Sequence, residues 1–341
     1  VTGSNGKTTT KEIIASILQQ EYSEKELLIT QGNFNNDIGL SLTIFKLKEE
    51  HKIAILEMGM NHKGEIEALT KIAPPDIAVI TNIGEAHIEN FESKDGIAAA
   101  KKEILNNISN NSFVILPRDD AYFGFLAKNL LPTKVITFGK SIDSDIYCVR
   151  HSNLVTRYFL IGKFLDVKCS LIGNHNVKNI MAAIGVAQTL KISINSIKKG
   201  IESFKGVPGR LELKYAKNGV TIIDDSYNSN PSSMKAAIDV LAEQSSPHKI
   251  LVIGDMAELG EQSQKLHNDI IGYINESCVS FTLAIGEEMQ QPITNHIKYG
   301  SWHSSKEDLI KELEVVIRED SVLLIKGSRS MKMEEIINKI R

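Results

Sequence analysis

The chain has few cysteines and no long apolar run. Cys148, Cys169 and Cys278 stand far apart, without a CxxC pair or the even number that is typical of a disulfide framework. We therefore expect reduced thiols and a cytoplasmic protein. No apolar run approaches the ~18 residues that a membrane-spanning helix requires, so we expect no transmembrane segment.

An excess of one charge is also missing. The 39 Lys and Arg residues nearly balance the 42 Asp and Glu residues, and both signs are mixed along the chain. This balance argues against a nucleic-acid-binding protein that relies on bulk positive charge. At 341 residues, 42% of them hydrophobic, the chain is long enough for two domains with sizeable cores.

Short β-branched runs recur along the chain, and most end in Gly or a polar residue. Helical patterns lie between several of them, as at Ile13, Ile14, Ile17 and Leu18. Apolar strands that alternate with helices predict parallel sheets covered on both faces. The runs are 53–59, 76–84, 112–119, 134–139, 219–225, 249–255, 281–287 and 322–328.

Residues 145–172 differ from these runs. They alternate apolar and polar residues and contain turn residues but no helical pattern, which predicts an antiparallel patch. The segment KGVPGR at 205–210 separates two α/β stretches. We therefore predict an α/β fold in which a P-loop ATPase domain (1–207), with a mainly parallel sheet plus the antiparallel patch, precedes a Rossmann-like domain (208–341).

Residues 3–8, GSNGKT, form a shortened phosphate-binding loop that leads into a helix. Glycines let backbone N–H groups turn toward phosphate oxygens, and the helix N-terminus adds a favourable dipole. Lys7 can reach the outer phosphates, and the hydroxyl of Thr8 can bind Mg²⁺. Because such a loop follows a strand, we expect Val1 and Thr2 to be the last residues of a truncated one.

Polar residues stand where several predicted strands end, and open parallel sheets bind ligands beyond these ends. Glu57 is either a Mg²⁺ ligand or a surface cap, and His87 is either a ligand or a structural residue. On spacing alone, Lys101 is expected on the solvent-exposed face of a helix. Its ammonium group is a poor metal ligand, because it has N–H donors and no acceptor. The set at the strand ends is Glu57, Asn82, His87, Asp225, Asp255 and Lys326.

Ten sequence blocks, in order over nearly the whole chain, resemble those of the Mur ligases. QGNFNND (31–37) and DDSYNSNP (224–231) are more specific than the phosphate loop. Within the family, the chain is most similar to members that join D-alanyl-D-alanine to UDP-N-acetylmuramoyl-tripeptide. The other blocks are VTGSNGKTTTKE, EMGMNHKGEI, TNIGEAHIENF, AAAKKEI, GNHNVKNIMAA, PGRLE, GDMAELGEQS and KGSRSMKME.

The resemblance implies ATP and two Mg²⁺ ions. The first ion would lie on Thr8 and Glu57, and the second on His87 and a carbamylated Lys101, because carbamylation supplies two oxygen ligands. Lys7, Lys101 and His87 would be catalytic. Nucleotide contacts would come from Gly3, Ser4, Asn5, Gly6, Lys7, Thr8, Thr9, Asn82, Asn174, Asn176, Arg210 and Asp225.

The implied reaction is ATP-driven amide formation through an acyl phosphate. The family's first domain, which binds the uridine nucleotide, would be absent from this sequence, and we expect a monomer without a nucleic-acid partner. On composition alone, residues 31–37 are a turn-rich loop. By resemblance, substrate contacts would come from Asn33, Asn35, Asn36, Asp255, Lys326, Ser328 and Arg329.

Two alternatives remain at this point. A ligase that extends a different muramoyl peptide, or a folylpolyglutamate synthase, is the nearest enzymatic one, and the blocks at 31–37 and 224–231 disfavour both. A non-catalytic nucleotide-binding module is the alternative of another class, and the joint presence of the implied metal ligands favours a catalyst over it. A motor or switch NTPase lacks support, because no helicase or GTPase motif is visible.

Overall fold

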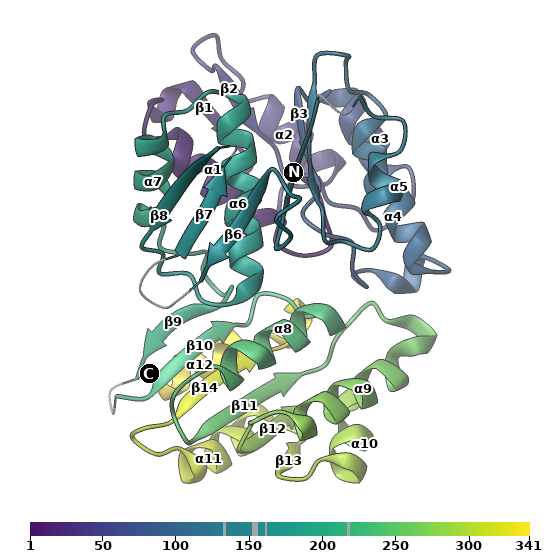
Figure 1. The fold of residues 1–341 in the computed structure, drawn as a ribbon. Coiled ribbons are helices and arrows are strands. Elements are labelled where there is room, and N and C mark those ends of the chain that lie inside the picture. Colours follow the sequence, from purple (N-terminus) through teal and green to yellow (C-terminus); the bar gives the residue numbers. More distant parts are fainter. Residues whose placement is uncertain (132–133, 152–155, 161, 217–218) are drawn as a thin grey trace. The chain divides into compact units, whose positions relative to one another are not determined.

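The computed structural model describes residues 1–131, 134–151, 156–160, 162–216 and 219–341, and these form two compact units (Figure 1). The first unit contains residues 1–84 and 91–205, and the second contains residues 85–90 and 206–341. The short segment 85–90 therefore belongs to the second unit, although the chain on either side of it belongs to the first. No helix in these described ranges is long and apolar enough to cross a membrane.

The first unit contains a mainly parallel set of strands. β1 pairs with β2, and β3 to β6 pair in parallel in sequence order. Residues 1–2 bridge the two sets, because Thr2 pairs with Ile80 while the Met58 amide donates to the Val1 carbonyl (2.9 Å). The strands are β1 (Leu27–Ile29), β2 (Ile53–Ile55), β3 (Ile77–Val79), β4 (Phe113–Pro117), β5 (Val135–Gly139), β6 (Ile146–Arg150), β7 (Thr156–Leu160) and β8 (Lys163–Val167).

The predicted antiparallel patch is confirmed. β7 pairs antiparallel with both β6 and β8, so the sheet changes direction at its last two strands. The alternation that marked this segment follows from its burial, since Thr156 and Tyr158 of β7 are buried while Arg157 between them is exposed. Residues 152–155 and 161 of the predicted segment lie outside the described residues.

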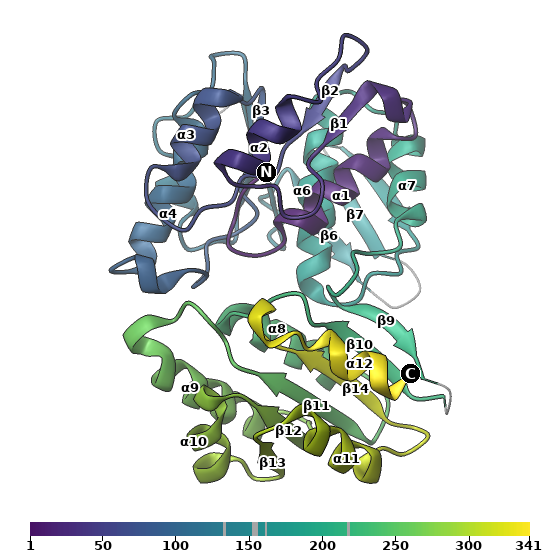
Figure 2. The ribbon, with the colours of Figure 1, turned by 180° about the vertical axis from the view of Figure 1, so that it is seen from behind.

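Helices pack on this sheet (Figures 1 and 2), with α6 against β3 to β6, α5 against β4 and α7 against β8, whereas Arg157 and Phe164 of the antiparallel strands are exposed. α1, α6 and α7 pack together, and a Cβ on Gly200 of α7 would lie 2.4 Å from the Cα of Ile17, so only glycine permits this approach. The helices are α1 (Lys7–Leu18), α2 (Asp37–Ile44), α3 (Glu65–Ile72), α4 (Lys94–Lys102), α5 (Phe123–Ala127), α6 (Asn174–Thr189) and α7 (Ile194–Ser203), with short 3₁₀ turns η1 (Glu24–Glu26), η2 (Ile88–Asn90) and η3 (Glu103–Leu105).

The second unit has one sheet with strand order β13-β12-β11-β14-β10-β9, parallel except for the edge strand β9. The carboxyl ends of β10, β11, β12 and β14 therefore meet at one edge of the sheet. The strands are β9 (Glu212–Tyr215), β10 (Thr221–Asp225), β11 (Lys249–Gly254), β12 (Phe281–Ile285), β13 (Gly300–His303) and β14 (Val322–Lys326).

The core of the second unit forms on both faces of this sheet. Alternate strand residues, such as Ile222, Val252 and Leu323, pack with Leu309 of α11 and Ile336 of α12. α8 and α9 cover the opposite face (Figures 1 and 2). The helices are α8 (Pro231–Ala242), α9 (Ser263–Glu276), α10 (Glu287–His296), α11 (Lys306–Val316) and α12 (Glu334–Ile340), with 3₁₀ turns η5 (Gly260–Gln262) and η6 (Arg329–Met331).

Candidate functional site

The loop before α1 has a backbone that only glycine accommodates. Gly3 and Gly6 adopt φ values of 146° and 80°. A Cβ on Gly3 would lie 1.9 Å from the hydroxyl of Thr81, and one on Gly6 would lie 2.3 Å from Oδ1 of Asn179. The loop is thus tightly enclosed by residues that are distant in the sequence, which fixes the direction of its backbone amides.

Asn82, predicted as a nucleotide contact, holds the loop by reciprocal hydrogen bonds. Its Oδ1 accepts from the Asn5 amide (3.1 Å), and its Nδ2 donates to the Asn5 carbonyl (2.9 Å). The hydroxyl of Ser4 similarly accepts from the Gly84 amide (2.7 Å) and donates to the Gly84 carbonyl (3.0 Å). The end of β3 and the loop therefore form one rigid piece, in which Asn82 has a structural role.

Lys7 is the first residue of α1, and its ammonium group returns to the loop. Nζ donates to the carbonyls of Gly3 (2.8 Å) and Ser4 (3.4 Å). Thr8 and Thr9, the next two predicted residues, are buried in the first turn of the helix. A cation folded over Gly-rich backbone at a helix N-terminus is suited to binding phosphate.

Glu57 follows β2 and is almost completely buried, with 2% of its surface exposed. Its backbone amide donates to the hydroxyl of Thr30 (3.0 Å), and its Oε1 accepts from Nδ2 of Asn35 (2.8 Å). Its Oε2 is buried without a hydrogen-bond partner in the described part of the chain. Because an unpaired buried carboxylate oxygen is costly, this atom fits a cation ligand.

Lys101 lies in the last turn of α4 and is 1% exposed. Burial lowers its pKa well below 10.5, and the nearby Lys7 ammonium adds a smaller effect in the same direction. Across the described ranges, its Nζ has neither a hydrogen-bond nor an ion-pair partner. A lowered pKa favours the neutral amine, which is a nucleophile, so the site fits the carbamylation that the resemblance implies.

A metal ion at Glu57 would need ligands other than acidic or histidine side chains. The described residues contain no group of three or more His, Cys, Asp or Glu side chains that could hold a metal. A hydroxyl such as that of Thr8, phosphate oxygens and water would complete the octahedron that Mg²⁺ requires. The site residues present are compatible with that ligand set.

The asparagines of residues 31–37 have different environments. Asn35 orients Glu57, as described above, whereas Asn36 accepts from the Gly39 amide (2.9 Å) and caps α2. Asn33 is exposed. The two asparagines predicted as nucleotide contacts, Asn174 and Asn176, both lie on α6 and also differ. Asn174 is exposed, whereas Asn176 is buried and donates to the Ile172 carbonyl (2.8 Å).

The second unit carries His87, on the segment 85–90. Its Nδ1 lies 2.5 Å from Oε2 of Glu258, on the loop after β11. The pair has the spacing of an ion pair but not the angles of a hydrogen bond, which a rotation of the imidazole ring would restore. The segment and the loop also meet through the Glu89 amide, which donates to the Glu258 carbonyl (3.3 Å).

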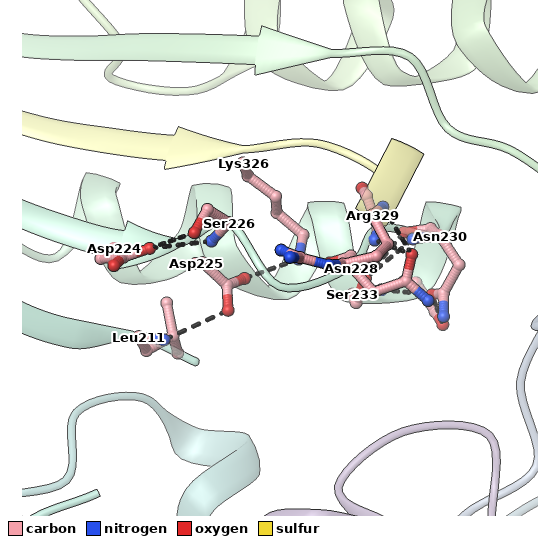
Figure 3. Close-up of polar contacts among 11 residues, drawn as sticks. Leu211, Asp224, Asp225, Ser226, Asn228, Asn230, Ser233, Lys326 and Arg329 are labelled. Atoms are coloured by element: carbon pink, nitrogen blue, oxygen red, sulfur yellow. Dashed lines mark hydrogen bonds and ion pairs between the residues drawn. The ribbon is translucent and has the colours of Figure 1, made fainter. Parts of the chain in front are cut away.

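Asp225 and Lys326, at the ends of β10 and β14, form an ion pair in which Lys326 is buried and Asp225 is partly exposed (Figure 3). Nζ of Lys326 lies 2.6 Å from Oδ2 of Asp225 and donates to the Asn228 carbonyl (2.8 Å). Oδ1 of Asp225 accepts from the Leu211 amide (3.1 Å). Both predicted residues are thus satisfied by contacts within the second unit.

The remaining predicted residues of the second unit are also engaged in contacts. Asp255 accepts from the Met289 amide at the start of α10 (3.0 Å), and burial raises its pKa. The hydroxyl of Ser328 accepts from the Ala257 amide (2.6 Å), and Arg329 pairs with Glu334 on the surface. The guanidinium of Arg210 stacks on the ring of Tyr227, 4.1 Å from its centroid.

Several residues of the site were not predicted as site residues, although most of them lie within the sequence blocks quoted above. Thr81 and Asn179 enclose the loop, and a buried Lys11 donates to the Thr30 carbonyl (2.6 Å) behind it. Glu258 and His267 shape the loop that meets His87. Their roles depend on contacts with residues that are distant in the sequence, and only the folded structure shows these contacts.

Family models match both units. The Mur ligase middle domain matches residues 1–187, and the glutamate ligase domain of Mur ligases matches residues 209–329. The first match contains the phosphate loop, Glu57 and Lys101. The second contains Asp225, Asp255 and Lys326.

Similar proteins cover the chain from end to end. UDP-N-acetylmuramoyl-tripeptide–D-alanyl-D-alanine ligase from Bacillus subtilis is 37% identical over 345 residues, which are 99% of this chain and 74% of the relative. The protein of the same name from Haemophilus influenzae is 35% identical over 350 residues, which are 100% of this chain and 76% of the relative. The chain thus spans about three quarters of each relative.

Solved structures agree with these relatives. MurF from Acinetobacter baumannii superposes with a TM-score of 0.91 at 33% identity, over 99% of this chain and 75% of that one. MurF from Thermotoga maritima in complex with ADP gives 0.86 at 29% identity, over 100% of this chain and 78% of that one.

Proposed function

The chain belongs to the Mur ligase family, and from this membership we propose that it joins D-alanyl-D-alanine to UDP-N-acetylmuramoyl-tripeptide in the synthesis of peptidoglycan precursors. ATP drives the reaction and leaves as ADP and phosphate. The relatives that match this chain over nearly its whole length are named for this activity. The ADP in the Thermotoga maritima structure supports a nucleotide site of the same kind here.

The reaction has two steps. The terminal carboxylate of the tripeptide attacks the γ-phosphorus of ATP, which forms an acyl phosphate and releases ADP. The amine of D-alanyl-D-alanine then attacks the acyl carbon, an amide bond forms, the amine loses a proton and phosphate departs. Phosphoryl transfer of this type depends on positioning and on offsetting charge.

The phosphate loop supplies the positioning. We assign the backbone of residues 3–6 and the ammonium of Lys7 to the phosphates of ATP, since the loop is held rigid by Asn82 and the cation already lies over it. Lys7 then offsets charge on the oxygens of the transferred group. Thr9 lies in the same first turn of α1, whose dipole favours the same anion.

Two Mg²⁺ ions are part of the proposal. Thr8 and Glu57 would hold the first, and His87 with a carbamylated Lys101 would hold the second; bound Mg²⁺ neutralises charge on the phosphate oxygens. The unpaired Oε2 of Glu57 supports the first assignment. The burial of Lys101, which lowers the pKa of its amine, supports the second, because the neutral form can add to CO₂ and release a proton to become an anionic carbamate.

We propose a central ATP-binding domain over residues 1–207 and a Rossmann-like ligase domain over 208–341. Arg210 and Asp225 are assigned to the nucleotide, as are Asn174 and Asn176 of α6. The free thiols agree with the cytoplasm, and the working form is proposed to be a monomer. The assigned substrate contacts are Asn33, Asn35, Asn36, Asp255, Lys326, Ser328 and Arg329.

One observation carries the proposal: a rigid phosphate loop shares its unit with the buried Glu57, whose Oε2 has no hydrogen-bond partner in the described residues, and with the buried Lys101, whose pKa is lowered. ADP release tests it, with UDP-N-acetylmuramoyl-tripeptide and either D-alanyl-D-alanine, D-alanine or L-alanyl-L-alanine. We expect stoichiometric ADP and amide product only with D-alanyl-D-alanine. Equal rates with a single amino acid would instead support a different muramoyl-peptide or folylpolyglutamate ligase.

A further inference from the structure

Within the described residues, Glu258 is the one acidic side chain that forms an ion-pair contact with the ring of His87. Its Oε2 lies 2.5 Å from Nδ1, and about half of the Glu258 side chain (44%) remains exposed. Resting on the proposed function, we propose that Glu258 is a positioning residue. It holds the proton of His87 on Nδ1 and thereby leaves the Nε2 lone pair available to a divalent cation.

The backbone supports a built contact rather than a chance encounter of two surface residues. His87 and Glu258 both have φ values of 62°, in the left-handed region that few non-glycine residues occupy. A conformation of this kind is strained for a residue with a side chain and persists only where its surroundings impose it. Two such residues in direct contact indicate that the fold places both side chains for a shared purpose.

The loop that carries Glu258 is anchored at three successive residues. Asp255 accepts from the Met289 amide at the start of α10, and the Met256 amide donates to Nε2 of the fully buried His267 (3.0 Å). The Ala257 amide donates to the hydroxyl of Ser328 (2.6 Å). The position of the Glu258 backbone is therefore set from inside the second unit.

The segment that carries His87 is fitted against the same loop. The Glu89 amide donates to the Glu258 carbonyl (3.3 Å), and a Cβ on Gly260, which has φ 54°, would lie 3.0 Å from the Cβ of Glu89. Side chain and backbone contacts thus act together on one short stretch, residues 87–90.

The chemistry follows from the two nitrogens of imidazole. A metal-binding histidine uses one nitrogen as the ligand and donates the N–H of the other to a carboxylate, which fixes the tautomer and ring orientation. Loss of such a partner typically lowers metal affinity or activity about 10–100-fold. Glu258 occupies the position of that carboxylate and does not itself bind the cation.

Nuclear magnetic resonance of ¹⁵N-histidine protein tests the tautomer without metal or turnover. The spectrum is recorded near pH 8, above the ordinary His pKa of about 6.5, and the His87 signals are assigned by their absence in His87→Gln. We expect protonated Nδ1 and unprotonated Nε2 in the wild type and in Glu258→Gln, whose amide oxygen still accepts. We expect the other tautomer to become populated in Glu258→Ala.

Glu261 is an exposed acid in the same region that makes no ion pair with His87 in the described residues, so Glu261→Ala is the matched control and keeps the wild-type spectrum. A second readout is the Mg²⁺ concentration at half-maximal ADP release, which should rise about 10–100-fold in Glu258→Ala and less in Glu258→Gln. A wild-type-like tautomer in Glu258→Ala overturns the proposal. A shifted tautomer in a protein without ligase activity would refute the proposed function alone.

Discussion

The phosphate loop of the first unit and the strand ends of the second differ in how their polar groups are satisfied. In the first unit, Oε2 of Glu57 and Nζ of Lys101 are buried without partners in the described ranges. In the second, Asp225 and Lys326 neutralise each other, and Ser328 is bonded to the neighbouring loop. The first region therefore has unmet capacity for ligands, whereas a ligand at the second must replace existing contacts.

This contrast separates two kinds of effect. Removing a group from the first region should reduce function while stability stays the same or increases, because unsatisfied buried groups oppose folding. Removing a group from the second region should reduce stability, because a partner is left uncompensated. Three substitutions test this contrast, and a fourth tests a helix cap of the first unit whose hydrogen bond is already satisfied.

The largest effect is expected from Lys326→Met, which leaves the Asp225 carboxylate without its cation. Breaking a fully buried pair in this way costs about 3–5 kcal/mol of the free energy of unfolding, and the partial exposure of Asp225 places this loss toward the lower end. Urea denaturation measures the loss, with Lys339→Met on the exposed side of α12 as the control. A loss below ~1 kcal/mol would mean that the pair is no more than a surface contact.

Lys7→Ala comes next and acts on turnover. Loss of the cation over the phosphates should slow ADP release about 10²–10³-fold or more, while thermal unfolding stays near the wild-type value. Lys25→Ala, on the exposed η1 turn, controls for the loss of a positive charge. Turnover near the wild-type rate would remove the phosphate loop from the mechanism.

Lys101→Met should abolish turnover and yet stabilise the protein at neutral pH. The depressed pKa means that the unfolded chain binds more protons here than the folded one between the folded-state pKa and 10.5. The contribution of Lys101 to the free energy of unfolding therefore increases with pH between its folded-state pKa and 10.5. Relief of even ~1 kcal/mol would raise the Tm by about 2–4 °C at pH 7, and the gain should shrink as pH approaches about 10.5. A lower Tm in the variant at pH 7 would contradict this explanation.

Asn36→Ala has the smallest expected effect. The side chain caps α2 through the Gly39 amide, and loss of an N-cap costs about 0.5–2 kcal/mol. Asn36→Asp retains the acceptor and should recover most of this stability, as measured by thermal unfolding. If Asn36→Asp were as unstable as Asn36→Ala, the cap would not be the reason that asparagine is required.

The sequence predicted the fold class and the strands that carry strong apolar runs. Each of the eight predicted runs contains a strand, because a buried parallel strand needs continuous apolar residues. β1, β9 and β13 were missed. Leu27–Ile29 is too short to stand out, Glu212–Tyr215 is an antiparallel edge strand, and Gly300–His303 has few apolar residues.

Site residues were predictable where their chemistry is local. The phosphate loop is a contiguous motif, and its glycines and Lys7 adopt the geometry that such a motif requires. The partners of Glu57 and His87 were not predictable, because Asn35 and Glu258 reach them only through the folded chain. The assignment of residues 85–90 to the second unit likewise depends on tertiary contacts that leave no pattern in the sequence.

The most direct test of the contrast between the two regions is where a divalent cation binds. Anomalous diffraction from a crystal grown with Mn²⁺ and ADP would locate the ion, since Mn²⁺ accepts the same oxygen ligands as Mg²⁺. We predict an ion bound to Oε2 of Glu57 and the hydroxyl of Thr8. An ion held by Asp225 or Asp255 instead, with Glu57 empty, would contradict the account.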